Sequence, residues 1–431
     1  MKFDEYFDVV IVGTGAAGLY CALNLPERYR ILLLTKQKAD ESDSFLAQGG
    51  ICMQHGEADY RPFFDDTMRA GHYENDPDTV GLMIRSSNSI VRDLVRRGVR
   101  FARDEQGALR FTREGAHSRA RILFHADITG KEITQTLLNQ ALRCPHIELR
   151  EHTTMLDFFA DASACGGVIA AGEGEEPRVI GAGAVVLACG GIGGLYKNST
   201  NFPHITGDAI AMALRHGVPC RNLNYVQIHP TTLHSKEKGR RFLISESVRG
   251  EGALLVNKNG SRFTNELLPR DVVSAAIHAQ MEKDGTDCVW EDMRPIGEKT
   301  LQEHFPNIVE RCRQEGYDPL HEPVPVVPAQ HYFMGGITAD LSSRTALPRL
   351  YACGETCCNG VHGRNRLASN SLLESLVFAR RAADDIQFGE PPAYTGGRPD
   401  LFVYQETEPL FAAYRSEVLS AIERSTPHAH E

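Results

Sequence analysis

Two histidines, one hydroxyl and two arginines in the second half of this 431-residue chain could together hold a small dicarboxylate. They are His229, Ser245, Arg270, His331 and Arg366. Arginine presents a planar fork of N–H donors that matches a carboxylate, and histidine adds a donor at the other end of the ligand. Each residue alone is more typical of a turn, a helix start or a core position. Together they predict a pocket for a two-ended anion.

A glycine-rich segment near the N-terminus could bind a pyrophosphate. It follows an apolar run at residues 9–12 and reads Gly13-Thr14-Gly15-Ala16-Ala17-Gly18. Between a strand and a helix, the pattern G-x-G-x-x-G places the helix N-terminus, with its free N–H groups and positive dipole end, against the phosphates. The context is the required one, so we predict dinucleotide binding.

A second segment, nearly the whole chain away, favours FAD as the dinucleotide. Residues 350–352 read as a strand that ends in Gly354 and Glu355. An acid at a strand tip suits the hydroxyls of a ribitol or ribose, and a helix beginning near Ser369 would direct N–H groups at the flavin ring. The acid usually found at the second strand tip is absent, and Thr35-Lys36 stands there instead. Lys36 is expected to meet adenosine hydroxyls or phosphate.

Composition excludes several classes of function. The net charge of −10 argues against a nucleic-acid partner, because phosphate binding needs a basic surface. No run approaches the about 20 apolar residues of a membrane span, and the N-terminus lacks a signal-peptide pattern, so we expect a cytoplasmic protein. The eleven cysteines show no repeating spacing. Cys353, Cys357 and Cys358 cluster near His362, but buried thiols are favoured over a metal site, and no metal is predicted.

The elements that must position these residues indicate an α/β protein. Residues 6–34 read as a strand, a helix from Ala16 to about Leu25 and a second strand, the opening of a doubly wound sheet. Residues 185–189 read as another buried parallel strand. Asp208 falls in the first turn of a helix that begins near Gly207.

The chain is long enough for two domains, and its composition changes between residues 223 and 332. We predict a Rossmann-like FAD-binding domain with an inserted α+β capping domain and a short helical C-terminal tail. The expected division is an FAD-binding domain at 1–222 and 333–392, a capping or substrate domain at 223–332, and a tail at 393–431.

From about residue 7 to 385 the chain resembles the L-aspartate oxidase family, within the succinate dehydrogenase and fumarate reductase flavoprotein superfamily. The motifs that carry the resemblance lie at residues 13–18, 44–51, 112–118, 229–231, 249–252, 269–271, 331–332 and 366–374. The family normally continues into a sizeable helical domain, so the tail at 393–431 is expected to be truncated relative to it.

The resemblance implies noncovalent FAD, because relatives with covalent FAD carry a histidine just before the A-Q-G-G motif and this chain has Asp43-Ser44 there. The implied cofactor contacts are Gly13, Thr14, Gly15, Ala16, Ala17, Gly18, Lys36, Ser44, Phe45, Leu46, Ala47, Gln48, Gly49, Gly50, Asp208, Glu355, Ser371 and Leu372.

The resemblance also implies a substrate site for L-aspartate. Arg366 and His331 would bind one carboxylate, and His229, Gln227 and Ser245 would surround the other. Ser245 takes the place of the threonine usual in the family and keeps its hydroxyl donor.

Two further residues would take part in the reaction. Glu114 would meet the substrate ammonium group, since a carboxylate facing a cation is a strong charge-assisted contact. Arg270 stands at the position of the family's active-site arginine. Guanidinium hardly gives up a proton, so an acid–base role and an electrostatic role both stay open.

The implied reaction oxidises L-aspartate to iminoaspartate with O2 or fumarate as acceptor, the first step of NAD (quinolinate) biosynthesis, with quinolinate synthase as metabolic partner. The alternatives are a soluble fumarate reductase or succinate-oxidising flavoprotein, and a flavin-binding protein without turnover.

Overall fold

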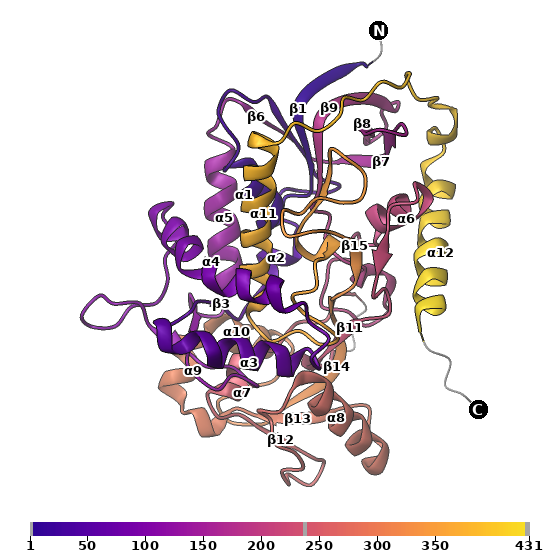
Figure 1. The fold of residues 1–431 in the computed structure, drawn as a ribbon. Coiled ribbons are helices and arrows are strands. Elements are labelled where there is room, and N and C mark those ends of the chain that lie inside the picture. The colour runs from indigo at the N-terminus through magenta and orange to yellow at the C-terminus, as the bar shows by residue number, and fades with distance from the viewer. Residues whose placement is uncertain (1–2, 236–238, 427–431) are drawn as a thin grey trace.

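A seven-stranded sheet forms the centre of the computed structural model, which describes residues 3–235 and 239–426 (Figure 1). Its strands, across the sheet, are β6 (Ile147–Arg150), β2 (Ile31–Leu34), β1 (Glu5–Val12), β9 (Arg178–Leu187), β8 (Cys165–Gly172) and β7 (Thr153–Ala160). β9 pairs with β1 along one side. On its other side, its earlier residues pair with β8 and its later residues pair with β16 (Leu350–Ala352). β6, β2, β1, β9 and β16 run parallel, whereas β7 and β8 are antiparallel to their neighbours.

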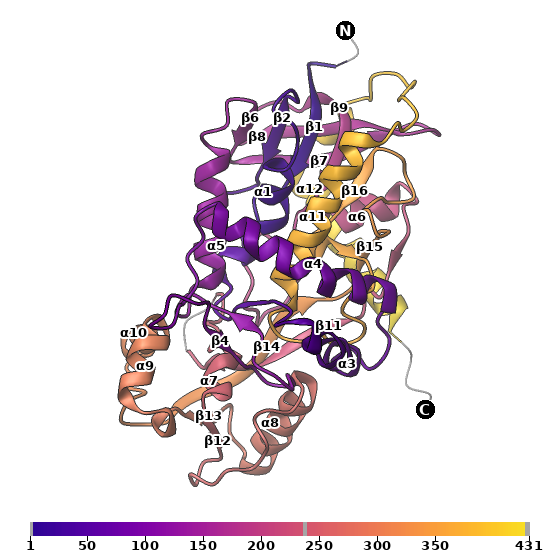
Figure 2. The same cartoon turned by 60° about the vertical axis from the view of Figure 1, so that its left-hand side comes forward.

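Both faces of this sheet are buried, and the later half of β1, residues 9–12, is apolar for this reason. Successive strand residues point to opposite faces, so Val9 and Ile11 enter one core cluster while Val10 and Val12 enter another. The helices on the first face are α1 (Ala16–Ala22), α5 (Thr129–Ala141) and α11 (Asn370–Phe388). Those on the second face are α6 (Asp208–Arg215) and α12 (Thr407–Ser425) (Figures 1 and 2).

Three more helices and two small sheets complete this part of the molecule. They are α2 (Asp43–Leu46), α3 (Tyr60–Ala70), α4 (Pro77–Arg96), the sheet of β3 (Ile51–Cys52), β5 (Ile122–Leu123) and β4 (Phe111–Thr112), and the sheet of β10 (Cys220–Arg221), β15 (Gly336–Thr338) and β17 (Cys357–Cys358). The 3-10 turns in this part are η1 (Glu57–Asp59), η2 (Gly193–Leu195), η4 (Gly354–Thr356) and η5 (Phe402–Tyr404), and η3 (Arg294–Ile296) belongs to the second body described next.

A second body lies below the central sheet in Figure 1 and has its own core. Its antiparallel sheet contains β11 (Val226–Leu233), β14 (Val324–Phe333), β13 (Val289–Asp292) and β12 (Leu254–Val256). Its helices are α7 (Glu246–Gly250), α8 (Arg270–Asp284), α9 (Glu298–His304) and α10 (Pro306–Gln314). The chain enters along β11 and leaves along β14, and these two strands pair with each other, so both connections lie side by side. The predicted fold class is confirmed.

Within the described residues, no helix combines the length and the apolar character that crossing a membrane requires. The same residues contain no group of three or more histidine, cysteine or acidic side chains arranged to hold a metal ion.

Candidate functional site

A cavity extends from the β1–α1 turn to the second body, and the empty space there, open solvent included, is about 1700 Å³. Its walls come from segments spread over most of the chain. They include the tips of β1 and β2, the α2 segment, the first turns of α6 and α8, the end of β14 and the turn that precedes α11.

The β1–α1 turn depends on two glycines at places where a side chain would not fit. Gly13 has a φ of 113°, and a Cβ on it would lie 2.1 Å from the carbonyl oxygen of Ala188. A Cβ on Gly18 would lie 2.0 Å from the carbonyl oxygen of Gly13. α1 therefore packs directly on the strand end, and its N-terminus opens into the cavity beside Gly15, as pyrophosphate binding requires.

At the tip of β2, Lys36 marks the nucleotide end of the cavity. Its ammonium group lies 2.6 Å from a carboxylate oxygen of Asp208 and 3.3 Å from the carbonyl oxygen of His204. The other carboxylate oxygen of Asp208 accepts a hydrogen bond from the Thr206 hydroxyl. The two residues predicted to contact the cofactor here are thus brought together as an ion pair.

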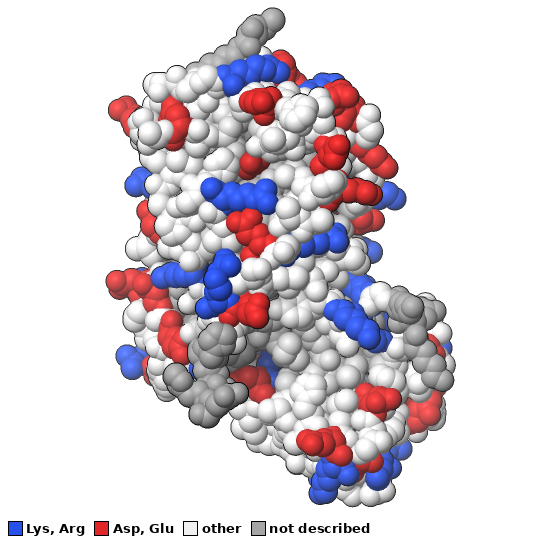
Figure 3. All heavy atoms as spheres, turned by 90° about the vertical axis from the view of Figure 1, so that its right-hand side faces the viewer, with Lys and Arg blue, Asp and Glu red and all other residues white. Residues whose placement is uncertain are grey.

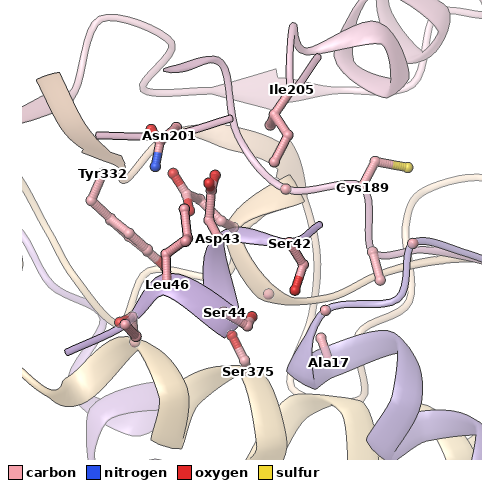
Figure 4. Close-up of a pocket in the computed structure, with 18 of the residues that line it drawn as sticks. Ala17, Ser42, Asp43, Ser44, Leu46, Cys189, Asn201, Ile205, Tyr332 and Ser375 are labelled. Carbon is pink, nitrogen blue, oxygen red and sulfur yellow. The ribbon is translucent and has the colours of Figure 1, made fainter. Parts of the chain in front are cut away.

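The α2 segment forms another wall and leaves polar atoms directed into the cavity. Buried and without a protein partner are Ser42 Oγ, Asp43 Oδ2 and Gln48 Oε1. Ser44 Oγ accepts a hydrogen bond from the Ala16 N–H, which ties this segment to α1. Figure 4 shows Asp43 on the same side of the pocket as Asn201 and Tyr332, with Ala17 and Cys189 on the other.

Glu355, at the end of β16, lies in the same wall. Its Oε1 accepts a hydrogen bond of 2.8 Å from the N–H of Phe333, at the end of β14. Burial, followed by the charge of Asp43, raises the pKa of Glu355 to about 8, and burial raises that of Asp43 to about 7. These donors and acceptors fit FAD. They are the glycine turn at the N-terminus of α1, the lysine at the tip of β2 and the inward polar atoms at both ends of the cavity.

Two buried arginines line the other end of the cavity, and one glutamine holds both. Gln227 Oε1 accepts hydrogen bonds from Arg270 Nη1 at 2.8 Å and from Arg366 Nε at 3.3 Å. Gln227 Nε2 donates to Asn365 Oδ1 and to the carbonyl oxygen of Arg366. Arg366 Nη1 donates to Ser371 Oγ, 2.6 Å away. Burial, with the positive charge of Arg270 as a second cause, lowers the pKa of Arg366 to about 10.

The two histidines lie beside these arginines, with their ring centres 5.1 Å apart. Burial, and then the charge of Arg270, lowers the pKa of both His229 and His331 well below the usual range, so both are neutral near pH 7. His331 Nδ1 lies 2.7 Å from the Thr200 hydroxyl. His229 Nδ1 is bonded to the backbone of Thr231, while its buried Nε2 has no protein partner.

Glu114 is buried in the same part of the cavity, on the loop after β4. Its two carboxylate oxygens accept hydrogen bonds of 2.6 Å from the hydroxyls of Ser247 and Ser369. Ser245, the N-cap of α7, lies 3.2 Å from Ser247 through their hydroxyls, so a short hydroxyl chain leads to Glu114. Burial and then the nearby charge of Glu246 raise the pKa of Glu114.

Glu246 is a further buried acid at this end of the cavity, and it is not among the predicted site residues. It accepts a hydrogen bond of 2.5 Å from Arg270 Nε and lies 3.7 Å from Arg249 Nη2. Burial works against its ionisation, but Arg270 and Arg249 outweigh burial and hold the pKa of Glu246 below its usual value. The sequence could have indicated Glu246, because it directly follows Ser245, a predicted site residue.

Most of the predicted site residues line the cavity, including Arg270, Glu114, His229, His331 and Arg366. Four predicted contacts stand behind its wall, namely Ala16, Gly18, Phe45 and Gln227. The last of these orients the arginines instead of facing the cavity.

Thr200, Asn201, Tyr332 and Asp43 line the cavity although they were not predicted to. Tyr332 adjoins a predicted histidine, and its ring lies 4.4 Å from the guanidinium carbon of Arg366. Thr200 and Asn201 had no sequence signal, because they come from a loop far along the chain from the motifs.

Comparison with known proteins agrees with this geometry. A family model described as an FAD binding domain matches residues 8–372. The chain is 48% identical over 380 residues to an L-aspartate oxidase of Clostridium perfringens, covering 88% of this chain and 86% of that protein. It is 46% identical to an L-aspartate oxidase of Clostridium acetobutylicum, covering 88% and 87%. A solved E. coli quinol fumarate reductase superimposes with a TM-score of 0.83 at 32% identity, covering 97% of this chain and 74% of that one.

Proposed function

Because this chain belongs to the L-aspartate oxidase family of FAD-binding proteins, we propose that it oxidises L-aspartate to iminoaspartate with noncovalently bound FAD. The observation that carries the proposal is the position of Glu114, a buried acid in the same cavity as Arg270 and Arg366. Two cations and an acid suit a ligand with two carboxylates and an ammonium group.

The two arginines and the two histidines bind the carboxylates of the substrate. Gln227 holds both guanidinium groups from behind, so their N–H forks are oriented before the substrate arrives. Neutral His229 and His331 contribute hydrogen bonds without adding positive charge. A substrate bound at both ends has its C2–H bond in one fixed orientation.

Glu114 receives the ammonium group of the substrate. The ammonium group loses a proton before the C2–H bond is broken, and a carboxylate whose pKa burial has raised is a better proton acceptor than an exposed one. FAD, when bound, supplies the acceptor for the hydride that leaves C2. The arginines retain the product carboxylates, and the cavity wall keeps water from the new imine.

The Arg270 and Glu246 pair supports an electrostatic role for Arg270. The Nε of Arg270 donates to Glu246 and its Nη1 donates to Gln227, so the position of the guanidinium group is fixed. We propose O2 or fumarate as the final electron acceptor. The product would enter NAD biosynthesis through quinolinate synthase as metabolic partner.

The test is anaerobic addition of L-aspartate to the purified holoprotein while flavin absorbance near ~450 nm is followed, since bleaching reports reduction of the cofactor. We expect bleaching by L-aspartate and none by D-aspartate or succinate. Flavin that stays oxidised with L-aspartate would refute the proposal.

A soluble fumarate reductase or succinate-oxidising flavoprotein is the second candidate. The fold of the E. coli quinol fumarate reductase favours it, and so does the arginine and histidine set, which needs only two carboxylates on its ligand. Glu114 discriminates, because succinate has no ammonium group for it to bind. Bleaching by succinate alone would establish this second function.

A further inference from the structure

The C-terminal helix α12 reaches the nucleotide end of the cavity, although it is more than 370 residues from the β2 tip along the chain. The ring centre of Phe411 lies 4.7 Å from the ammonium nitrogen of Lys36. Val418, two turns later, packs against Gly207, where a Cβ would lie 3.5 Å from its Cγ1. Gly207 directly precedes Asp208, the ion-pair partner of Lys36.

Lys36 is therefore held by three groups that come from two parts of the chain, residues 204–208 and Phe411. Asp208 provides the carboxylate, the loop at His204 provides a carbonyl oxygen, and Phe411 provides the face of an aromatic ring. A lysine side chain is flexible and strongly hydrated, so a single ion pair confines its ammonium group poorly. An aromatic face attracts the cation and restricts where it can move.

The position of α12 does not depend on Phe411. Tyr414 is fully buried and its hydroxyl donates a hydrogen bond of 2.7 Å to the carbonyl oxygen of Leu156 on β7. Glu417 forms a 2.6 Å ion pair with Arg215 of α6. Val418 is also fully buried in the core cluster of the second sheet face. Phe411 also contacts the ring of Tyr414, with the ring centres 5.8 Å apart. The other contacts of α12 should keep the helix in place when Phe411 is changed, and its contact with Lys36 is then tested by comparing backgrounds with and without the ammonium group.

We propose that Phe411 is a positioning residue for FAD, acting through Lys36. The side chain at the tip of β2 meets the adenosine part of a dinucleotide in this type of fold, so an ordered ammonium group there strengthens cofactor binding. The C-terminal helix thereby contributes to cofactor retention without lining the cavity. The proposal rests on FAD binding and is independent of the identity of the substrate.

The experiment measures FAD release from the holoprotein after dilution, by the rise in flavin fluorescence. Phe411→Leu keeps the apolar bulk but removes the ring, and we expect it to release FAD about three- to tenfold faster. Phe411→Tyr retains the ring and should release FAD at the rate of the unchanged protein. Leu419→Ala is the matched control, because Leu419 is an exposed residue on the same helix.

A double-mutant cycle with Lys36→Met separates positioning from a general loss of stability. With the ammonium group removed, Phe411→Leu should cause no further acceleration of release. Equal release from the protein with and without Phe411→Leu would overturn the proposal, and so would the same acceleration in the Lys36→Met background. If Phe411→Leu fails to accumulate as holoprotein, Phe411→Met replaces it under the same criteria.

Discussion

Gln227 shows how one residue prepares the substrate end of the cavity. Its amide oxygen lies between Arg270 and Arg366, two buried cations whose mutual repulsion contributes to the lowered pKa of Arg366. An incoming dicarboxylate relieves this repulsion and replaces the water lost on burial. The arrangement therefore binds anions strongly even though the whole chain carries a net charge of −10.

Replacing Arg366 by lysine should weaken substrate binding while FAD is retained. Lysine cannot donate to Gln227, Ser371 and a carboxylate in the planar geometry of the guanidinium group. We expect the KM for L-aspartate in Arg366→Lys to rise about 100-fold. Steady-state kinetics with FAD content measured in parallel checks this, and Arg364→Lys, at an exposed neighbour, is the control. An unchanged KM would remove Arg366 from the substrate site.

Replacing Glu114 by glutamine should affect aspartate and succinate differently. Burial raises the pKa of Glu114, so its ionised fraction, which pairs with the substrate ammonium group, increases as pH rises through that pKa. In the unchanged protein, kcat/KM for L-aspartate should rise over this range. Glu114→Gln should lower kcat/KM by about 100-fold and lose this rise.

Any succinate turnover should change less than about threefold in Glu114→Gln. The pH profile of kcat/KM with both substrates provides the measurement. An equal loss with succinate would mean that Glu114 has a structural role, through its bonds to Ser247 and Ser369.

At the scale of elements, β13 carries an unusual acid into the core of the second body. Glu291 is fully buried between β12 and β14, and neither carboxylate oxygen has a hydrogen-bond partner. Burial raises its pKa to about 8, the positive charge of Arg249 opposes this, and the charge of Glu266 adds to it. Near pH 7 the side chain is mostly a neutral acid inside an apolar sheet.

Glu291 should make the protein less stable at high pH. Its pKa in the folded state lies above the value in the unfolded chain, so its contribution to stability is fully present below about pH 4.5 and is lost as pH rises through about 8. Glu291→Gln removes this loss. The Tm of the variant relative to the unchanged protein should rise by about 3 °C between pH 5 and pH 9.

Thermal unfolding of the holoprotein at the two pH values gives this comparison. Glu310→Gln, at an exposed residue of α10, should show no such trend. A constant Tm difference for Glu291→Gln would show that Glu291 does not titrate in this range.

At the scale of the molecule, the segment between α11 and α12, residues 389–406, crosses the central sheet. This crossing segment contacts both the residues just before β1 and the turn between β7 and β8. Arg398 donates two hydrogen bonds to the carboxylate of Asp4. Asp161, in the turn between β7 and β8, accepts hydrogen bonds from the N–H groups of Thr395 and Gly396.

The face of the molecule that carries α12 mixes acidic and basic side chains, without a large area of one charge sign (Figure 3).

Removing the Asp161 carboxylate should release this crossing segment. Backbone N–H groups, of Ser163 first and Thr395 next, hold the pKa of Asp161 below its usual value, so it is ionised at neutral pH and binds the segment as an anion. We expect chymotrypsin to cleave after Tyr394, next to the N–H groups that Asp161 holds, about tenfold faster in Asp161→Ala, measured by mass spectrometry over time.

Asp104→Ala is the control for this cleavage. Asp104 caps another exposed turn through the N–H groups of Gln106 and Ala108 but does not touch the crossing segment. If both variants are cleaved at the same rate, Asp161 does not hold the segment.

The sequence by itself determined those features that depend on neighbours along the chain. The glycine turn after β1, the apolar runs of the central parallel strands and the helix start at Arg270 after Pro269 are local patterns. Backbone conformation and strand faces follow from adjacent residues. Most of the site residues that the motifs predicted do line the cavity.

Only the tertiary structure decided which side chains meet across the chain. Gln227 was expected to face the substrate but stands behind Arg270 and Arg366. The Thr200 hydroxyl forms a hydrogen bond with His331 that no pattern in the sequence indicated. Phe411 reaches Lys36 from the last helix. Such contacts depend on how the layers pack and on the angle at which each loop returns, and packing is specified by all the buried residues together rather than by any local pattern.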